Sequence, residues 1–599
     1  MNLLNDAIKA HQSGNFPLAK QCYLKQLSYF KNDVNANQLL GALLFNQGEY
    51  KEAKLYLKKS LSLNSKQAHV LCNLASCYFM CEQVSEAKSY FKKAINCQVD
   101  YLDSHIKLIK LLKVHGDKRE LVSACKKGMF HFPNNIYILE SLADAYAESN
   151  ELEQSITLYN NILTKHPNGH KNRLNLGVAH RKNGRPELAL EQYLYLQSNQ
   201  INSYQLFHNI ANAYSDLGNL TKAIDYYQRT LMLNNLYIEA HRNLNDLLWE
   251  TNQKDKYLNS FKLSLQSNAS DIKLNFAYIE ELIRVSMFQE AKVYLSELGS
   301  QFLNFAKYHD LRAQTEIGLD DNENALESQK QAVELNDVTT EQLIRYAKNL
   351  IEHNNVQEAE FQLQRALKFE PNEQMAIAYL GVCWRLMDNP REKILNNYND
   401  LVCEYILPLP TEHGTVENFC HELNDYLDEY HTGTNQPLGQ TLVNGTQTRG
   451  ALFSHQSPLI QTLVKCISDC INDYIQRRSN TQQLDISKRH VNSFEYAGSW
   501  SVRLSTGGFH AMHVHPMGWI SSVLYIELPD CVEKGNQEGW LCLGEPALSL
   551  KPKLEAIKFV KPVVGKLVLF PSYMWHGTVP FDTGKQRTTI VFDAIPNTN

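Results

Sequence analysis

Small and apolar residues recur every 34 residues over the first two thirds of the 599-residue chain. One series holds alanine or glycine at nine of its twelve positions, and a second series, displaced by twelve residues, holds alanine or serine at nine of twelve. Only small side chains fit where two helices cross closely, so the pattern predicts two packed helices and a short turn in each repeat. The first series is Ala7, Gly41, Ala75, Ile109, Ala143, Gly177, Ala211, Asn245, Ile279, Ala313, Ala347 and Gly381; the second is Ala19, Ala53, Ala87, Leu121, Ser155, Ala189, Ala223, Tyr257, Ala291, Ala325, Ala359 and Lys393.

Turn-forming residues lie between the two series, for example at Gln47-Gly48-Glu49 and Asn183-Gly184-Arg185. A helix–turn–helix period of 34 residues resembles the tetratricopeptide repeat. The resemblance assigns residues 1–400 to a solenoid of about twelve repeats, an all-α superhelix whose concave groove holds a protein or peptide segment. Leu121, Asn245 and Tyr257 interrupt the series, which indicates either a bend in the superhelix or sequence drift.

Asparagine recurs two positions before the first series, on what is expected to be the inner helix of each repeat. The residues are Asn5, Asn73, Asn175, Asn209 and Asn243. An asparagine amide can both donate to and accept from an extended backbone. The arrangement resembles the inner asparagine ladder in the tetratricopeptide array of O-linked N-acetylglucosamine transferase, so these residues are candidates for a peptide groove. The alternative is that they cap helices or lie on a solvated face.

The last third of the chain, residues 401–599, has a different pattern. Two amphipathic helices are expected at 416–430 and 458–477, separated by a turn-rich polar segment at 443–450. From about Val491 onward, short β-rich runs alternate with glycine and proline turns, at 499–504, 521–526, 540–543, 565–571 and 587–592. Many short strands of this kind predict a double-stranded β-helix, that is, a jelly-roll, cupin-like domain with flanking helices.

Composition narrows the function classes. The formal net charge is −5, and the sequence has no long Lys/Arg tract and no apolar run of transmembrane length. We therefore expect neither a nucleic-acid partner nor a membrane partner. The first residues lack the pattern of a secretion signal, and the 13 cysteines are scattered and odd in number. This cysteine usage predicts reduced thiols and a cytoplasmic location.

Three histidines carry the candidate chemistry. His513 and His515 are two residues apart, so their side chains point to the same face of a strand, and His576 follows a later β-rich run. Three imidazoles with an open position predict a divalent metal site, which suits iron and also a zinc hydrolase. His510 is an alternative ligand, and one of the three is alternatively a hydrogen-bonding neighbour of the metal site.

Arg587 lies in an apolar β-run, where burying an arginine without a partner is costly. A dicarboxylic acid would provide that partner through a planar two-point contact. Thr589 lies two residues on and points to the same side, and Tyr525 in the strand after the histidine pair is a further donor. The alternative is an edge-strand arginine in solvent.

The order of these residues resembles the 2-oxoglutarate and iron(II)-dependent oxygenases, whose pattern is HxD/E, a distal His, and an Arg about ten residues beyond it. Within that family it is similar to the subgroup with N-terminal tetratricopeptide repeats. The resemblance rests on Asn444–Thr448, His513–Ser522 and Leu569–Thr578. It implies a dioxygenase that binds Fe(II), 2-oxoglutarate and molecular oxygen, with His513, His515 and His576 as metal ligands and Arg587, Thr589 and Tyr525 at the cosubstrate.

The chain departs from the family pattern at His515, which stands where the family has an acid. Three neutral imidazoles leave Fe(II) with a larger net charge than two imidazoles and one carboxylate. Two functions follow as alternatives. One is hydroxylation of a protein or peptide recruited by the repeats, with Asn492, Arg503, Trp519 and Trp575 as candidate substrate contacts. The other is an interaction scaffold whose jelly roll binds metal without catalysis. The substrate, the metal in the cell and the oligomeric state stay open.

Overall fold

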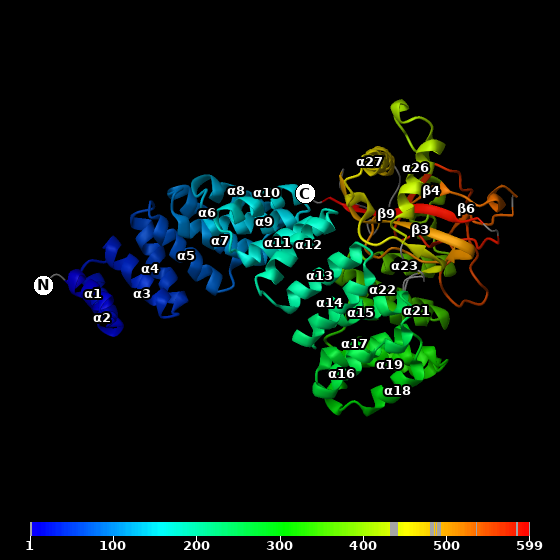
Figure 1. Cartoon of the computed structure of the whole chain (residues 1–599). Coiled ribbons are helices and arrows are strands. Elements are labelled where there is room, and N and C mark those ends of the chain that lie inside the picture. The colour runs from blue at the N-terminus through cyan, green and yellow to red at the C-terminus, as the bar shows by residue number, and fades with distance from the viewer. Residues whose placement is uncertain are drawn as a thin grey trace. The chain divides into compact units, whose positions relative to one another are not determined.

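The computed structural model describes residues 3–431, 441–479, 484, 487, 493–534, 536–582 and 585–597. These form two compact units, Met1–Asn183 and Gly184–Asn599. The first unit is a run of antiparallel helix pairs (Figure 1). Its helices are α1 (Leu3–Gln12), α2 (Phe16–Tyr29), α3 (Val34–Asn46), α4 (Tyr50–Leu63), α5 (Ala68–Met80), α6 (Val84–Cys97), α7 (Leu102–His115), α8 (Lys118–His131), α9 (Ile136–Glu148), α10 (Leu152–Lys165) and α11 (His170–Lys182).

The second unit continues the helix pairs and then changes to strands. Its helices are α12 (Pro186–Ser198), α13 (Tyr204–Asp216), α14 (Leu220–Leu233), α15 (Ile238–Glu250), α16 (Asn259–Ser267), α17 (Ile272–Arg284), α18 (Phe288–Glu297), α19 (Ala306–Gly318), α20 (Asn322–Glu334), α21 (Thr340–Glu352), α22 (Val356–Phe369), α23 (Gln374–Leu386), α24 (Arg391–Leu395), α25 (Tyr398–Leu401), α26 (Val416–Asp428) and α27 (Pro458–Ser479). Its strands are β1 (Cys403–Ile406), β2 (Leu442–Gln447), β3 (Phe494–His510), β4 (Ile520–Glu527), β5 (Leu541–Leu543), β6 (Lys558–Val560), β7 (Lys566–Pro571), β8 (His576–Thr578) and β9 (Arg587–Pro596). Short 3₁₀ helices cover Lys254–Lys256, Ser300–Phe302, Thr411–His413, Leu452–Ser454 and Asp530–Lys534.

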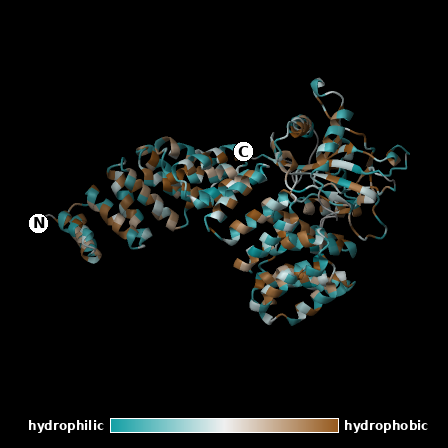
Figure 2. Cartoon of the chain, viewed as in Figure 1, coloured by the Kyte–Doolittle hydropathy of each residue, from teal (hydrophilic) through white to brown (hydrophobic). Residues whose placement is uncertain are grey.

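The repeat pattern explains how the helix pairs pack. Every residue of the first small series is buried. A Cβ added to Gly41 would lie 2.7 Å from the Leu57 side chain, so the crossing of α3 and α4 leaves no room for a larger residue. In Figure 2 hydrophobic and hydrophilic positions alternate along each helix ribbon, as expected for helices that bury one stripe. The tetratricopeptide superhelix is therefore confirmed.

One of the breaks in the series lies at the helix pair α15 and α16. Tyr257 replaces the small residue there, and its hydroxyl donates to Glu281, 2.5 Å away. A 3₁₀ turn precedes it, and Leu258 has a positive φ of 66°. The second helix of this repeat consequently starts late and covers only Asn259–Ser267. The interruption in the sequence thus corresponds to a local irregularity of the solenoid.

The strands form two antiparallel sheets, in the orders β1-β7-β4-β9-β3-β2 and β6-β5-β8. This arrangement is consistent with the predicted jelly roll. All five expected β-runs contain strands, and the two expected helices correspond to α26 and α27. The segment 443–450, predicted to be turn-rich, instead contributes most of β2, because its backbone pairs with β3. Strands β1, β6 and β8 are three or four residues long, too short for a period to be visible in sequence.

Alternation along β4 and β9 separates two cores. Ile520, Leu524, Ile590, Phe592 and Ala594 face α26 and α27 in one apolar cluster. The opposite faces of these strands turn toward the interior of the sandwich. There Val523 and Tyr525 belong to a second cluster, which continues without interruption into the packed residues of α21, α22 and α23. The last repeats and the sandwich therefore share one core.

Polar contacts also join the repeats of the second unit to the sandwich. Arg385 of α23 donates to the carbonyl of Gly544, 2.7 Å away, and the Tyr573 hydroxyl donates to the carbonyl of Leu395 at 2.9 Å. Further along the array, Arg449 donates to Ser215 at 2.9 Å and pairs with Glu250. The sandwich thus contacts the solenoid at two separate places, around α13–α15 and around α21–α25.

Candidate metal centre

His513, His515 and His576 converge on one point of the sandwich interior. The backbones of His513 and His576 form an isolated antiparallel bridge with N–O distances of 2.9 and 3.0 Å. His515 joins them because its N–H donates to the carbonyl of Ser572, 3.0 Å away. One ring nitrogen from each of the three residues lies within 4.8 Å of the others. Among the described residues, this is the cluster that could hold a metal ion.

The second ring nitrogen of each histidine has a partner that can only accept. Nδ1 lies 2.7 Å from the Ala511 carbonyl in His513, 2.9 Å from the Met574 carbonyl in His576, and 2.6 and 2.7 Å from the two carboxylate oxygens of Asp593 in His515. We therefore assign the proton of each ring to Nδ1. Three Nε2 lone pairs remain available, and the Nε2 atoms of His513 and His515 are 3.1 Å apart.

Burial keeps the rings of His513 and His576 neutral. Desolvation, with a smaller contribution from the neighbouring imidazoles, lowers the pKa of His513 to about 3 and the pKa of His576 well below its ordinary value. The pKa of His510 is lowered well below its ordinary value for the same reasons. A neutral imidazole is the form that binds a metal, so neither His513 nor His576 has to lose a proton before a cation enters.

Asp593 is the site residue that sequence reasoning missed. It lies on β9, and its Oδ1 accepts from the Ser521 hydroxyl at 2.7 Å. The Ser521 hydroxyl is in turn 2.9 Å from that of Ser572, and Trp500 stacks beside His515 with ring centres 6.2 Å apart. A signal was present, since Arg587, Thr589, Val591 and Asp593 are spaced by two and share one face of the strand.

These four β9 residues line one cavity of about 430 Å³ together with the three histidines and His510. Arg587 is only 2% exposed. Its Nε donates to the Gly539 carbonyl at 3.2 Å, and no carboxylate among the described residues forms an ion pair with it. Burial lowers the pKa of Arg587 below its ordinary value. A buried cation that opens onto a cavity is a ready partner for an organic acid.

Tyr525 and Thr589 lie beside Arg587. They are directly opposite partners on β4 and β9, so their side chains share one face. Tyr525 is fully buried, and its ring centre is 5.1 Å from the Arg587 guanidinium carbon. Burial raises the pKa of Tyr525 to about 12, which keeps the hydroxyl a donor.

The structure places the other predicted residues elsewhere. His510 lines the cavity but does not belong to the cluster of three metal-binding histidines. Trp519 is buried between the large sheet and the helices, and Trp575 packs against Tyr379 with ring centres 5.2 Å apart; neither lines the cavity. Arg503 is paired with Asp428 at 2.6 Å, and Asn492 lies outside the described residues.

The asparagines predicted to form a peptide ladder lie on the first helices of their repeats. The amide of Asn175 donates to Asp144 of the preceding repeat at 3.2 Å. The amide of Asn243 lies 3.2 Å from Nε2 of His208, also in the preceding repeat. Both side chains therefore link neighbouring repeats. Asn5, Asn73 and Asn209 lie on α1, α5 and α13, and are exposed or half-buried.

The described residues thus form a tetratricopeptide array followed by a sandwich that holds three convergent histidines and a buried arginine. Sequence comparison agrees. Residues 498–593 match the family described as "Putative 2OG-Fe(II) oxygenase", and residues 34–67, 68–96, 141–203 and 204–235 match tetratricopeptide repeat families. The chain thus carries a C-terminal domain of that oxygenase family preceded by tetratricopeptide repeats.

Individual proteins are similar to parts of this chain. The BBSome complex member BBS4 of Bos taurus is 25% identical over 186 residues, covering 31% of this chain and 36% of that protein's length. Among solved structures, the MamA protein is 24% identical over 28% of this chain and 92% of its own, with a TM-score of 0.26. Yeast Tom70 is 16% identical over 65% of this chain and 89% of its own, with a TM-score of 0.35.

The oxygenase family implies Fe(II) and 2-oxoglutarate, and the residues present fit both. Three Nε2 atoms face one point without competing protons, and imidazole suits iron. Arg587, which has no carboxylate partner among the described residues, lines the same cavity together with Thr589, as an acid that chelates the metal would require. Within the ranges that the structure describes, no helix has the length and apolar character needed to span a membrane.

Proposed function

We propose that the protein is a 2-oxoglutarate- and Fe(II)-dependent dioxygenase that hydroxylates a protein or peptide recruited by its repeats. The observation that carries the proposal is the joint placement of three open imidazole nitrogens and the buried Arg587 on one cavity. When bound, Fe(II) and 2-oxoglutarate supply the oxidising chemistry: one atom of dioxygen enters a substrate C–H bond, and the other enters succinate as carbon dioxide is released.

The chain's own residues have distinct tasks in this reaction. His513, His515 and His576 hold the metal through Nε2. Arg587 binds the far carboxylate of the cosubstrate, with hydroxyls from Thr589 and Tyr525 as further donors. Apolar residues of the lining exclude bulk water, which strengthens these charged contacts. They are Val514, Val523, Leu541, Phe570 and Val591.

A second cavity favours a polypeptide substrate. It measures about 390 Å³ and is lined by one face of α21, by the start of α23 and by Pro516. Pro516 also lines the metal cavity, so the two cavities adjoin at this residue. Met517, which lines the metal cavity, is 83% exposed. A segment held between α21 and α23 would therefore place a neighbouring side chain at the mouth of the metal cavity.

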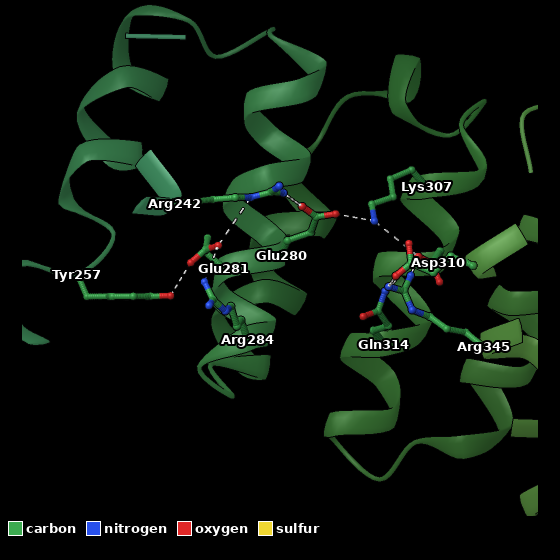
Figure 3. A network of polar contacts seen from close by, with 10 residues as sticks. Arg242, Tyr257, Glu280, Glu281, Arg284, Lys307, Asp310, Gln314 and Arg345 are labelled. Atoms are coloured by element: carbon green, nitrogen blue, oxygen red, sulfur yellow. Dashed lines mark hydrogen bonds and ion pairs between the residues drawn. The ribbon is translucent and has the colours of Figure 1, made fainter. Parts of the chain in front are cut away.

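Ion pairs join the first helices of the repeats that precede α23. Figure 3 shows a network in which Arg242 pairs with Glu280, Lys307 with Glu280, and Arg345 with Asp310. These pairs link α15, α17, α19 and α21. In the second cavity, by contrast, Lys348 and Glu370 form no ion pair with any described residue. Those two charges are the groups that an incoming polypeptide would meet.

The test has two stages. Apo-protein loaded anaerobically with Fe(II) and 2-oxoglutarate should develop a weak visible charge-transfer band, and on exposure to oxygen it should release succinate. Both signals should be lost in His513→Ala. Absence of the band and of succinate in the wild-type protein would reject the proposal.

Substrate recruitment is tested with an immobilised random-peptide library as probe. The double variant Lys348→Glu/Glu370→Lys should change the peptides captured and hydroxylated, while substrate-independent succinate release stays the same. Exposed Lys330→Glu serves as the control charge reversal. If capture is unchanged in the double variant, the recruiting surface lies elsewhere.

A metal-binding scaffold without catalysis is the second candidate, favoured by one observation: none of the three clustered ligands is a carboxylate. It predicts metal in the purified protein but no oxygen-dependent succinate. For location, all 13 cysteines are free thiols, which favours a reducing compartment such as the cytoplasm.

A further inference from the structure

We propose that Asp593 supplies, through His515, the negative charge that an acidic ligand would otherwise bring to the metal. Asp593 is then a positioning residue, because it contacts the metal ligand His515 and does not bind the metal itself. The inference rests on the proposed metal site. It assigns a function to a carboxylate that the family's HxD/E pattern does not include.

Asp593 contacts His515 closely through both of its carboxylate oxygens. Both carboxylate oxygens lie within hydrogen-bonding distance of Nδ1, at 2.6 and 2.7 Å. Because they face Nδ1, they point away from the Nε2 atom that is open to the metal. The cluster of described residues with convergent ligand atoms accordingly contains the three histidines and not Asp593. A direct Asp593–metal bond would require this pair to separate.

The carboxylate is held in place by the fold. Ser521 and Asp593 are paired residues of β4 and β9, and the Ser521 hydroxyl donates to Oδ1. Gly518 leaves the space that this arrangement needs, because a Cβ there would lie 2.3 Å from the Ser572 hydroxyl and 3.3 Å from Oδ1 of Asp593. Asp593 is 8% exposed, so its charge is only weakly screened by solvent.

The charge count gives the reason for this arrangement. Three neutral imidazoles leave a divalent ion with two positive charges, whereas two imidazoles and a carboxylate leave one. Adding Asp593 restores the single net charge at the level of the whole site. A carboxylate that accepts from the other ring nitrogen also fixes the imidazole orientation and raises its basicity, and losing such a partner typically weakens metal binding about 10- to 100-fold.

The first experiment titrates the apo-protein with Co(II), followed by its visible d–d absorption. Asp593→Asn keeps the shape and one acceptor oxygen but removes the charge. We expect its Co(II) affinity to fall about 10- to 100-fold, with an altered d–d spectrum and an unchanged far-UV circular dichroism spectrum. Asp530→Asn, which changes an exposed carboxylate paired with Lys585, should have no effect. A change of less than about twofold in Asp593→Asn, or an equal loss in the control, would overturn the inference.

The second experiment moves the charge. His515→Asp alone places two carboxylates side by side, and their repulsion should weaken Co(II) binding. His515→Asp/Asp593→Asn leaves one carboxylate, now in the ligand position, and should bind Co(II) more tightly than either single variant. Simple additivity would contradict the inference. Neither titration uses 2-oxoglutarate or oxygen, so wild-type Co(II) binding without this dependence rejects only the role of Asp593. A wild-type protein that binds no Co(II) rejects the metal site and the proposed function together.

Discussion

The guanidinium carbon of Arg587 lies 5.1 Å from the centre of the Tyr525 ring. The two residues belong to adjacent strands, and both are buried. The ring face offers Arg587 a cation–π contact, which compensates only part of the cost of removing a charge from water. The uncompensated part of this desolvation free energy destabilises the folded protein as long as no anion is bound in the cavity.

Replacing Arg587 with methionine should therefore have opposite effects on stability and binding. The melting temperature of the metal-free protein should rise, because a buried charge without a counter-ion is removed. Binding of 2-oxoglutarate to the Mn(II)-loaded protein should weaken by at least about tenfold, since a charge-assisted hydrogen bond contributes about 1.5–3 kcal/mol. Calorimetry of unfolding and of ligand titration measures the two effects.

Arg503→Met is the matched control for that variant. Arg503 also lies in a strand, but it has an ion pair with Asp428 and hydrogen bonds to Asn424. Its replacement should lower the melting temperature and leave 2-oxoglutarate binding intact. A fall in melting temperature in both variants would show that Arg587 is satisfied within the protein.

Metal removal should affect one compact unit of the chain. The three histidines all lie in Gly184–Asn599. A cation that binds only the folded site stabilises it by about 2.7 kcal/mol at one hundred times its dissociation constant. Chelation should lower the melting transition of this unit and leave that of Met1–Asn183 in place, as read by scanning calorimetry. The shift should vanish in His513→Ala; if chelator moves both transitions equally, the two units do not unfold separately.

Arg345, which pairs with Asp310 in the network of Figure 3, also pairs with a second acid, Glu341. Asp310 is 1% exposed and lies 2.5 Å from Arg345, whereas Glu341, which also pairs with Arg345, is 67% exposed. Asp310→Ala should destabilise the second unit by about 3 kcal/mol, because it leaves a half-buried guanidinium without its buried partner. Glu341→Ala should cost less than about 1 kcal/mol. Urea unfolding measures the loss of stability in each variant. Equal losses in the two variants would show that the burial of Asp310 does not determine its contribution.

His431 gives the second unit a predictable acid sensitivity. Burial, with a smaller contribution from Arg503, lowers its pKa to about 4. The unfolded chain takes up this proton near pH 6.5, so the contribution to stability is complete above that pH. This contribution to the free energy of unfolding, about 3 kcal/mol in total, is lost as the pH falls toward 4. In His431→Gln, the urea concentration at the unfolding midpoint should change less between pH 7.5 and 5 than it does in the wild-type protein. Replacing the exposed His421 should leave the wild-type dependence on pH in place.

The sequence predicted the parts of this molecule that depend on periodicity. Small residues spaced by 34 located the helix crossings, because each repeat must solve the same packing problem. His513 and His515 were found because a spacing of two defines a strand face, and Arg587 because a charge in an apolar run requires an explanation.

The remaining features depend on contacts between distant segments. The spacing of Asp593 from Arg587 predicts only a shared strand face; the pairing of β4 with β9 brings Asp593 to Ser521 and His515. Trp519 and Trp575 illustrate the converse case: both lie near a metal-site histidine in sequence, but Trp519 packs in the cluster with α26 and α27, and Trp575 packs against Tyr379. The helical repeats could not reveal that their last members pack against the sandwich.

The common core of the last repeats and the sandwich limits where the chain can be cut into separately folding parts. Cutting before β1 would expose the surfaces that cover Tyr379 and Trp575, and the liberated piece should precipitate rather than fold. The terminal helical hairpins must accompany the sandwich whenever it is moved. Gene fusion or shuffling would thus transfer the last repeats and the cavity with the three histidines together, as one folded block.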